Sequence, residues 1–269
     1  PSGGWRLATA TGGALSARRV VLATGGRSVP ATGSRGWGLE VASALGHTVH
    51  PTYPALTPLT AHPHPHAQLA GVSLEARIEA PGTDFRTTDG FLVTHRGWSG
   101  PAVLDASHLA VRGRPEGGRQ ELTVSWTPTI EDRRWDRELQ EGAGSVRTAL
   151  AERLPRSLVD RLLEEAEVAR DTSLAQLRRE ERARVVEHLT AYRLPWTGDE
   201  GYKKAEVTGG GVALEEVDPT TLESRVVPDL YLCGELLDAF GPIGGHNFLW
   251  AWATGRSAGT GAARSMGTG

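Results

Sequence analysis

The sequence is poor in cysteine, in excess basic charge and in long apolar runs. Cys233 is the single cysteine, which excludes an internal disulfide and indicates a reducing, cytoplasmic setting. No apolar stretch approaches the ~18 residues of a membrane span, and no signal-peptide pattern opens the chain, so we expect no membrane partner. Lys and Arg total 29 against 32 Asp and Glu, a balance that predicts no nucleic-acid partner.

A dinucleotide-binding fingerprint is also lacking. No G-x-G-x-x-G segment follows a predicted strand, and no acidic residue stands at the required distance, about 20 residues beyond one. The chain begins with Pro1 rather than methionine. We therefore expect either that a leading segment has been removed or that this is a piece of a longer protein.

Glycine, by contrast, is abundant, with 34 residues in a chain of 269, a length that suits about two domains. Residues 17–23 predict a short buried strand that runs into glycines, and residues 38–45 predict a helix ended by Gly46. Short β-prone pieces separated by Pro, Gly and Asp fill residues 47–126, and helical periodicity fills residues 130–192. From Tyr202 onward the pattern again predicts short strands and glycine-rich turns.

This order predicts an α/β dinucleotide-binding domain interrupted by two inserts. We assign residues 1–46 to the first part of that domain, 47–129 to a β-barrel-like insert, 130–200 to a helical insert, and 201–269 to the return of the first domain.

Three glycine clusters are the candidates for chemistry. In the first, Gly25, Gly26 and Gly33 follow the strand and precede a helix, so a ligand could approach the backbone, although a tight turn would use the same residues. The second is the run from Gly209 to Gly211, which indicates close approach by another group or a flexible hairpin.

The third cluster follows an apolar strand that ends at Cys233. Glu235 places a carboxylate at the carboxyl end of this strand, and Gly244 and Gly245 precede an apolar helix that we expect to be buried. Such a carboxylate can accept hydrogen bonds from a ribose-like hydroxyl chain, and the helix N-terminus favours a group that becomes anionic. A reduced flavin is such a group, because its ring becomes anionic.

The chain resembles the bacterial NAD(FAD)-utilizing dehydrogenase flavoproteins, also called HI-type or BaiN-like conserved flavoproteins. The resemblance covers nearly the whole chain and rests on residues 23–34, 94–102, 208–212 and 234–247, which occur in family order. It implies a two-dinucleotide-binding-domain flavoprotein that binds FAD and lacks its N-terminal G-x-G-x-x-G segment here. The residues that it assigns to the cofactor are Thr24, Gly25, Gly26, Gly33, Ser34, Thr208, Gly209, Gly210, Gly234, Glu235, Asp238, Gly244, Gly245, His246 and Asn247.

The function that follows is an FAD-dependent oxidoreductase, or a truncated form of one. Hydride would pass between flavin and NAD(P)H or a small organic substrate, and no side chain is assigned as catalytic. The alternative is a non-catalytic fragment or partner-binding module that does not retain FAD. The sequence does not define the oligomeric state.

Several other residues have simpler interpretations. The histidines at positions 62, 64 and 66 alternate with prolines, which predicts a solvated loop and no metal site. His246 could tune the flavin or serve only in packing, Cys233 is expected to be an inert buried thiol, and Trp250 and Trp252 are expected in the core.

Overall fold

The computed structural model describes residues 4–112 and 120–264 and divides the chain into two compact units. Unit 1 comprises residues 1–55 and 201–269, and unit 2 comprises residues 56–200. Each unit has its own hydrophobic core. Residues 1–3, 113–119 and 265–269, which belong to the predicted domains, lie outside the described residues.

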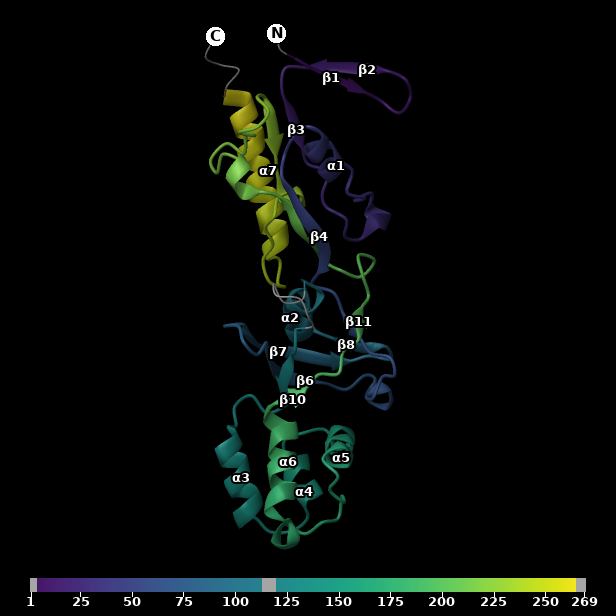
Figure 1. Cartoon of the computed structure of the whole chain (residues 1–269), viewed down its shortest axis with the longest axis vertical. Coiled ribbons are helices and arrows are strands. Elements are labelled where there is room, and N and C mark those ends of the chain that lie inside the picture. The colour runs from purple at the N-terminus through teal and green to yellow at the C-terminus, as the bar shows by residue number, and fades with distance from the viewer. Residues whose placement is uncertain (1–3, 113–119, 265–269) are drawn as a thin grey trace. The chain divides into compact units, whose positions relative to one another are not determined.

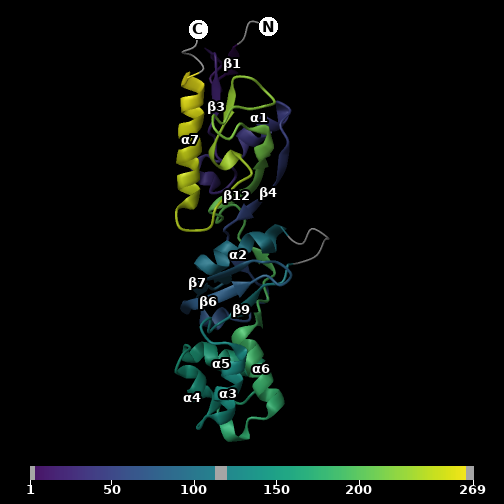
Figure 2. The same ribbon diagram turned by 90° about the vertical axis from the view of Figure 1, so that its left-hand side faces the viewer.

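Within residues 4–55 and 201–264, unit 1 contains three two-stranded pairings and two α-helices (Figure 1). The parallel pair, β3 with β13, is the nucleotide-binding type of pairing expected from the sequence, and α7 lies along it in both Figure 1 and Figure 2. The elements are β1 (Trp5–Ala8), β2 (Ala14–Ala17), β3 (Val20–Leu22), α1 (Trp37–Ala44), β4 (Val49–Ala55), β12 (Val207–Val212), β13 (Leu230–Leu232) and α7 (His246–Arg264). Short 3₁₀ turns occupy η1 (Pro30–Thr32), η4 (Leu214–Glu216) and η5 (Gly234–Leu236).

Helix α1 matches its sequence prediction closely. Gly36 before it and Gly46 after it both have positive φ, at 80° and 97°, conformations that glycine adopts without a steric penalty. The Gly46 N–H donates to the Ser43 carbonyl, so the predicted helix stop is confirmed.

Strand β4 lies in unit 1, whereas the sequence prediction placed residues 47–129 in the first insert. β4 pairs antiparallel with β12, and an irregularity in the pairing falls between Gly209 and Gly211. The core of unit 2 runs from Leu59 to Trp196, so the sheet and the helices that we had assigned to two inserts share one interior.

In its described residues, 56–112 and 120–200, unit 2 combines a seven-stranded sheet with five α-helices (Figure 2). The strand order is β10-β9-β6-β7-β8-β5-β11, which leaves β10 and β11 at the edges instead of closing the predicted barrel. Its strands are β5 (Leu59–Thr60), β6 (Ser73–Glu79), β7 (Arg86–Val93), β8 (Gly97–Ser99), β9 (Thr123–Ser125), β10 (Tyr192–Arg193) and β11 (Gly198–Asp199). Its helices are α2 (Pro101–Arg112), α3 (Asp132–Glu141), α4 (Val146–Ala151), α5 (Arg156–Glu165) and α6 (Arg179–Thr190), with 3₁₀ turns η2 (Ala67–Leu69) and η3 (Leu174–Gln176).

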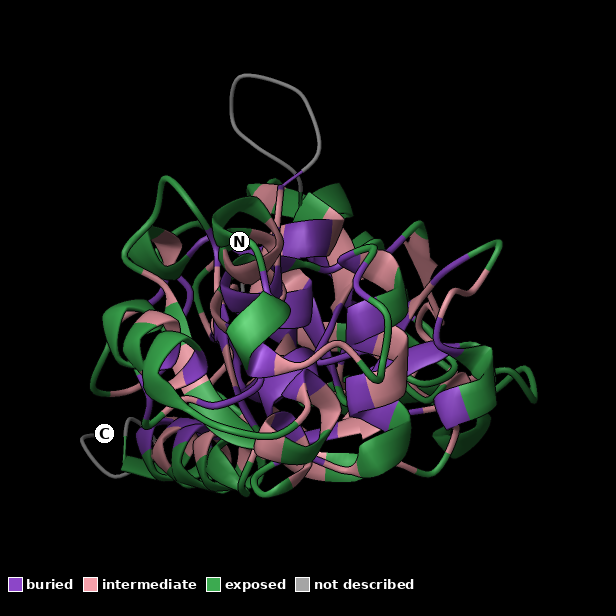
Figure 3. Ribbon diagram, turned by 90° about the horizontal axis from the view of Figure 1, so that it is seen from below, coloured by how far each residue is buried: buried purple, intermediate pink, exposed green. Residues whose placement is uncertain are grey.

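Helix α7 is less buried than the sequence suggested. Phe248, Leu249 and Trp252 are 68%, 63% and 71% exposed, so the expectation of a core position for Trp252 and of a buried helix is wrong. Figure 3 colours the described residues by how far they are buried. The apolar content of the helix could not reveal which side faces the sheet. Thr254 and Ala258 are among its buried residues.

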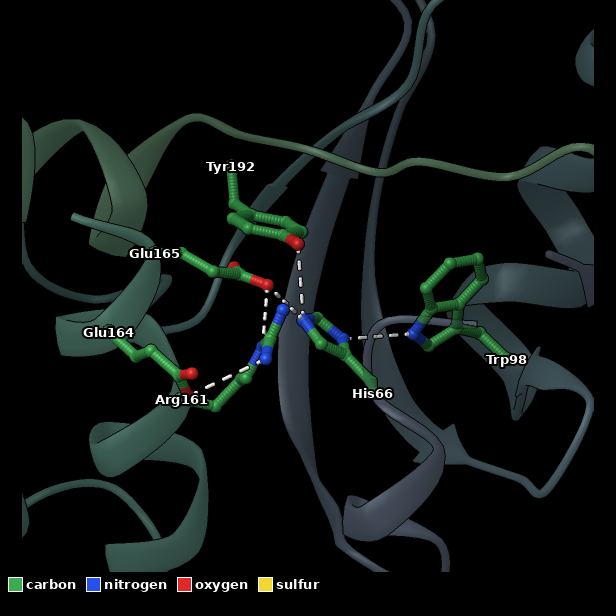
Figure 4. Close-up of polar contacts among 6 residues, drawn as sticks. All are labelled: His66, Trp98, Arg161, Glu164, Glu165 and Tyr192. Atoms are coloured by element: carbon green, nitrogen blue, oxygen red, sulfur yellow. Dashed lines mark hydrogen bonds and ion pairs between the residues drawn. The ribbon is translucent and has the colours of Figure 1, made fainter. Parts of the chain in front are cut away.

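The histidine loop at residues 62–66 is not simply solvated, which corrects a second expectation. His66 is fully buried and lies between Trp98 and Tyr192 (Figure 4). The Trp98 Nε1–H donates to His66 Nδ1 over 3.3 Å, and His66 Nε2 lies 3.1 Å from the Tyr192 hydroxyl and 3.5 Å from Glu165 Oε1. The imidazole therefore links the sheet of unit 2 to its helices.

No helix within residues 4–112 and 120–264 has both the length and the apolar character needed to cross a membrane. Over the same residues, no three His, Cys, Asp or Glu side chains gather as a metal site would require.

Candidate functional site

Three segments that are distant in sequence meet in unit 1. They are the loop after β3, strand β12, and the turn η5 after β13. The Thr208 N–H donates to Glu235 Oε1 over 3.0 Å, and the Thr208 hydroxyl accepts the N–H groups of Arg27 and Ser28 over 2.7 and 3.1 Å. The carboxylate after one parallel strand is thus tied to the loop after the other.

Gly26 is required by this close approach. A Cβ at this position would lie 2.5 Å from both Glu235 Oε1 and Thr208 Oγ1, which is closer than real Cβ atoms come. The Ser34 hydroxyl donates to the Gly26 carbonyl over 2.9 Å, and a Cβ on Gly25 would lie 2.7 Å from Ser34 Oγ. The first predicted cluster therefore forms a compact loop whose backbone rests on the carboxyl group.

A cavity of about 420 Å³ opens beside Glu235, within the range of small-molecule sites. Its lining is mainly apolar and includes three aromatic side chains, Phe240, Phe248 and Trp250. The other lining residues are Val29, Glu206, Val207, Glu235, Ala239, Gly245, Asn247 and Ala251. Because the lining contains two carboxyl groups and no basic side chain, the cavity suits an uncharged ring or hydroxyl-bearing group better than a phosphate.

Burial raises the pKa of Glu235 above the usual range of a glutamate. Hydrogen bonds from the Thr208 side chain and from the backbone of Thr208 and Ser28 oppose this rise without cancelling it. The carboxyl group therefore holds a proton at a higher pH than an exposed glutamate would, and it can both accept and donate hydrogen bonds within a wider pH range.

The amino end of α7 forms another side of the cavity. Gly244 and Gly245 have φ values of 111° and 91°, and a Cβ on Gly245 would meet no atom within 4 Å. Asn247 fixes the turn before the helix, since its Oδ1 accepts the Gly241 N–H over 2.8 Å and its Nδ2 donates to the Gly241 carbonyl over 3.0 Å. The start of this 19-residue helix supplies positive potential at an open, side-chain-free position.

The structure thus gathers Gly26, Thr208 and Glu235 in mutual contact, and it places Glu235, Gly245 and Asn247 around one cavity. Their role toward a cofactor stays a prediction.

Other predicted residues lie apart from the cavity lining. Asp238 Oδ2 lies 2.6 Å from His50 Nδ1. The Gly234 N–H donates to Thr254 Oγ1 over 2.9 Å. Gly209 and Gly210 pack closely against β4. A Cβ on Gly209 would overlap the Tyr53 ring, and a Cβ on Gly210 would overlap the Pro51 carbonyl. The remaining predicted residues, Thr24, Gly33, Gly244 and His246, do not line the cavity either, and His246 is exposed.

Sequence reasoning missed several contributors. Ser28 and the backbone of Arg27 complete the loop, yet they carried no signal beyond following the two glycines. Phe240 lies inside the third cluster and lines the cavity, so its aromatic character was a usable signal. Val29 has a φ of 48°, in the left-handed region that β-branched residues avoid, and nothing in the sequence indicates this strain.

Comparison with known proteins gives a consistent family assignment. Residues 2–261 match the family described as the HI0933-like protein Rossmann domain. The chain is 37% identical over 246 residues to the ribosomal RNA dihydrouridine synthase of Escherichia coli (strain K12), covering 89% of this chain and 59% of that protein. It is 34% identical over 262 residues to the 3-dehydro-bile acid delta(4,6)-reductase of Clostridium scindens, covering 94% and 64%. The ribosomal RNA dihydrouridine synthase of Haemophilus influenzae is 31% identical over 252 residues, covering 88% and 58%. The chain therefore spans about three fifths of the length of these relatives.

Proposed function

Because this chain belongs to the HI0933-like Rossmann-domain family, we propose that it is, or is part of, an FAD-dependent oxidoreductase. The observation that carries the proposal is the convergence of Gly26, Thr208 and Glu235 beside a cavity bordered by the start of α7. The similarity to an enzyme named as a reductase supports the same class of chemistry. We further propose that it acts in the cytoplasm, with NADH or NADPH as the electron donor.

The residues present fit a flavin cofactor. Gly26 and Gly245 are places where a side chain would either clash with the protein or fill the space beside the helix end. Glu235 would accept hydrogen bonds from hydroxyl groups of the cofactor chain, and the amino end of α7 would favour a ring that gains negative charge. Phe240 and Trp250 would exclude water from the ring. A bound flavin supplies the hydride transfer.

The printed names of the relatives suggest the type of substrate. Dihydrouridine is uridine saturated at one carbon–carbon double bond, and a delta(4,6)-reductase saturates a double bond of a steroid ring. We therefore propose that this protein reduces a carbon–carbon double bond in a planar ring. A small-molecule substrate agrees with the absence of basic residues from the cavity lining. Uridine in ribosomal RNA is the second candidate, which two relatives favour by name.

The experiment that tests the oxidoreductase is a visible spectrum of the purified chain, alone and after incubation with FAD, followed by anaerobic addition of NADH and NADPH. We expect flavin absorption bands that bleach with one of the two donors. A chain that takes up no flavin under either condition would support the alternative, a non-catalytic or partner-binding module. Ribosomal RNA from cells with and without the gene, analysed by mass spectrometry for a gain of two hydrogens per uridine, separates the two substrate candidates.

A further inference from the structure

Thr208 is not among the residues that line the cavity. Thr208 is 1% exposed, and its hydroxyl oxygen is shared by three groups of the loop after β3. Two are the N–H groups of Arg27 and Ser28, and the third is the Ser28 hydroxyl at 3.2 Å. Thr208 therefore does not line the site, although the family resemblance placed it there.

Two of these hydrogen bonds have a fixed direction. A threonine hydroxyl has two lone pairs and one proton. Both lone pairs of Thr208 Oγ1 accept backbone N–H groups, so its single proton is left for Ser28 Oγ or for the Glu235 carboxyl group. Ser28 is 4% exposed, so these polar atoms are almost fully shielded from water. If one of them were removed, its hydrogen-bond partners would be left unpaired.

This hydroxyl acts on Glu235 directly, through a side-chain hydrogen bond, and also through the loop. The same residue donates its own N–H to Glu235 Oε1, and Gly26 lies against both oxygen atoms. Removing the hydroxyl would leave the backbone contact to Glu235 intact. It would remove the side-chain hydrogen bond to Glu235 and release the loop that rests on the carboxyl group.

We propose that Thr208 is a positioning residue whose hydroxyl holds the loop of residues 26–28 against Glu235, so that the Glu235 carboxyl meets a hydroxyl-bearing cofactor in one fixed orientation. This inference rests on the proposed flavin-dependent function. Ser28 is the partner that fixes the rotamer of Thr208, and the cofactor would contact neither side chain.

The test compares Thr208→Val with Thr208→Ser in the full chain. Valine keeps the volume and loses the hydroxyl, whereas serine keeps the hydroxyl and loses a methyl group. A positioning role through hydrogen bonds predicts that Thr208→Val weakens FAD binding about tenfold, and that Thr208→Ser binds within about twofold of wild type. Thr127→Val is the matched control, because Thr127 is also buried and hydrogen-bonded but lies in unit 2.

Hydrogen exchange in the flavin-free chain provides the second measurement. The amides of Arg27 and Ser28 should exchange at least about tenfold faster in Thr208→Val and at the wild-type rate in Thr208→Ser. The inference would be overturned if Thr208→Val preserved both FAD affinity and amide protection. It would also be overturned if Thr208→Ser impaired them as much as Thr208→Val does. A wild-type chain that binds no flavin would instead overturn the proposed function, and the exchange rates would still decide whether Thr208 holds the loop.

Discussion

Neutralising Glu165 tests the buried contact between the sheet and the helices of unit 2. Glu165 Oε1 accepts the Arg161 Nε–H over 2.7 Å and lies 3.5 Å from His66 Nε2, with only 16% of its side chain exposed. Glu165→Gln keeps the shape of the side chain and removes its charge. A charge-assisted hydrogen bond contributes about 1.5–3 kcal/mol, so we expect unit 2 to lose about 2 kcal/mol of unfolding free energy at neutral pH.

The pH dependence of this loss has a definite sign. Burial raises the pKa of Glu165, but the hydrogen bonds from His66 and Arg161 and the positive charge of Arg161 outweigh burial and hold the pKa below its ordinary value. A carboxyl with a lowered pKa stabilises the fold above its unfolded pKa of about 4.3, and this contribution is lost as the pH falls through the folded pKa. The difference between wild type and Glu165→Gln should therefore be constant near neutrality and shrink below about pH 4.

Urea unfolding followed by tryptophan fluorescence at several pH values measures both effects, since the buried Trp98, Trp126 and Trp135 report on unit 2. Glu164→Gln is the matched control, because Glu164 is 59% exposed and lies 3.5 Å from the same arginine, so it should cost under about 0.5 kcal/mol. Equal losses for the two variants, or a Glu165→Gln loss that grows as the pH falls, would refute this account of the cluster.

Three further perturbations have expected outcomes. Gly26→Ala should abolish FAD uptake in an absorbance assay, because the new Cβ would displace Glu235 or Thr208, and uptake at the wild-type level would contradict the close approach. Cys233 is 3% exposed and burial raises its pKa, so a thiol reagent should react with it slowly in the native chain and rapidly in urea; equal rates would disprove its burial. His47→Ala should lower the unfolding free energy by about 2–4 kcal/mol in urea titration, because its buried ring bonds at both nitrogens, and a change under about 0.5 kcal/mol would be inconsistent with that role.

Local pattern predicted the framework of unit 1 well. The strand ending near Ala23, the helix ended by Gly46 and the carboxylate at Glu235 each follow from neighbouring residues, because turn chemistry and strand ends are encoded locally. Thr208 and Glu235, which the family resemblance assigns to the cofactor, contact each other, but their role toward a cofactor stays a prediction.

The failures involve contacts that no local window contains. His66 and Tyr192 are 126 residues apart, so the histidine loop gave no sign that its last member would be enclosed by aromatic rings. Trp252 lies in a helix that is apolar on several sides, and periodicity alone cannot say which side another element will cover. The seven-stranded sheet was underestimated for a related reason, since β5, β10 and β11 are only two residues long and too short for alternation to show.

The discontinuity of unit 1 has a consequence for biosynthesis. Ser28 and Thr208 stand on opposite sides of the excursion through residues 56–200, so a ribosome must translate all of that excursion before their hydroxyls can meet. A chain that ends within residues 56–200 has the glycine loop but lacks Thr208, which holds the loop in place. The proposed cofactor site therefore assembles only after residues 56–200 have been translated.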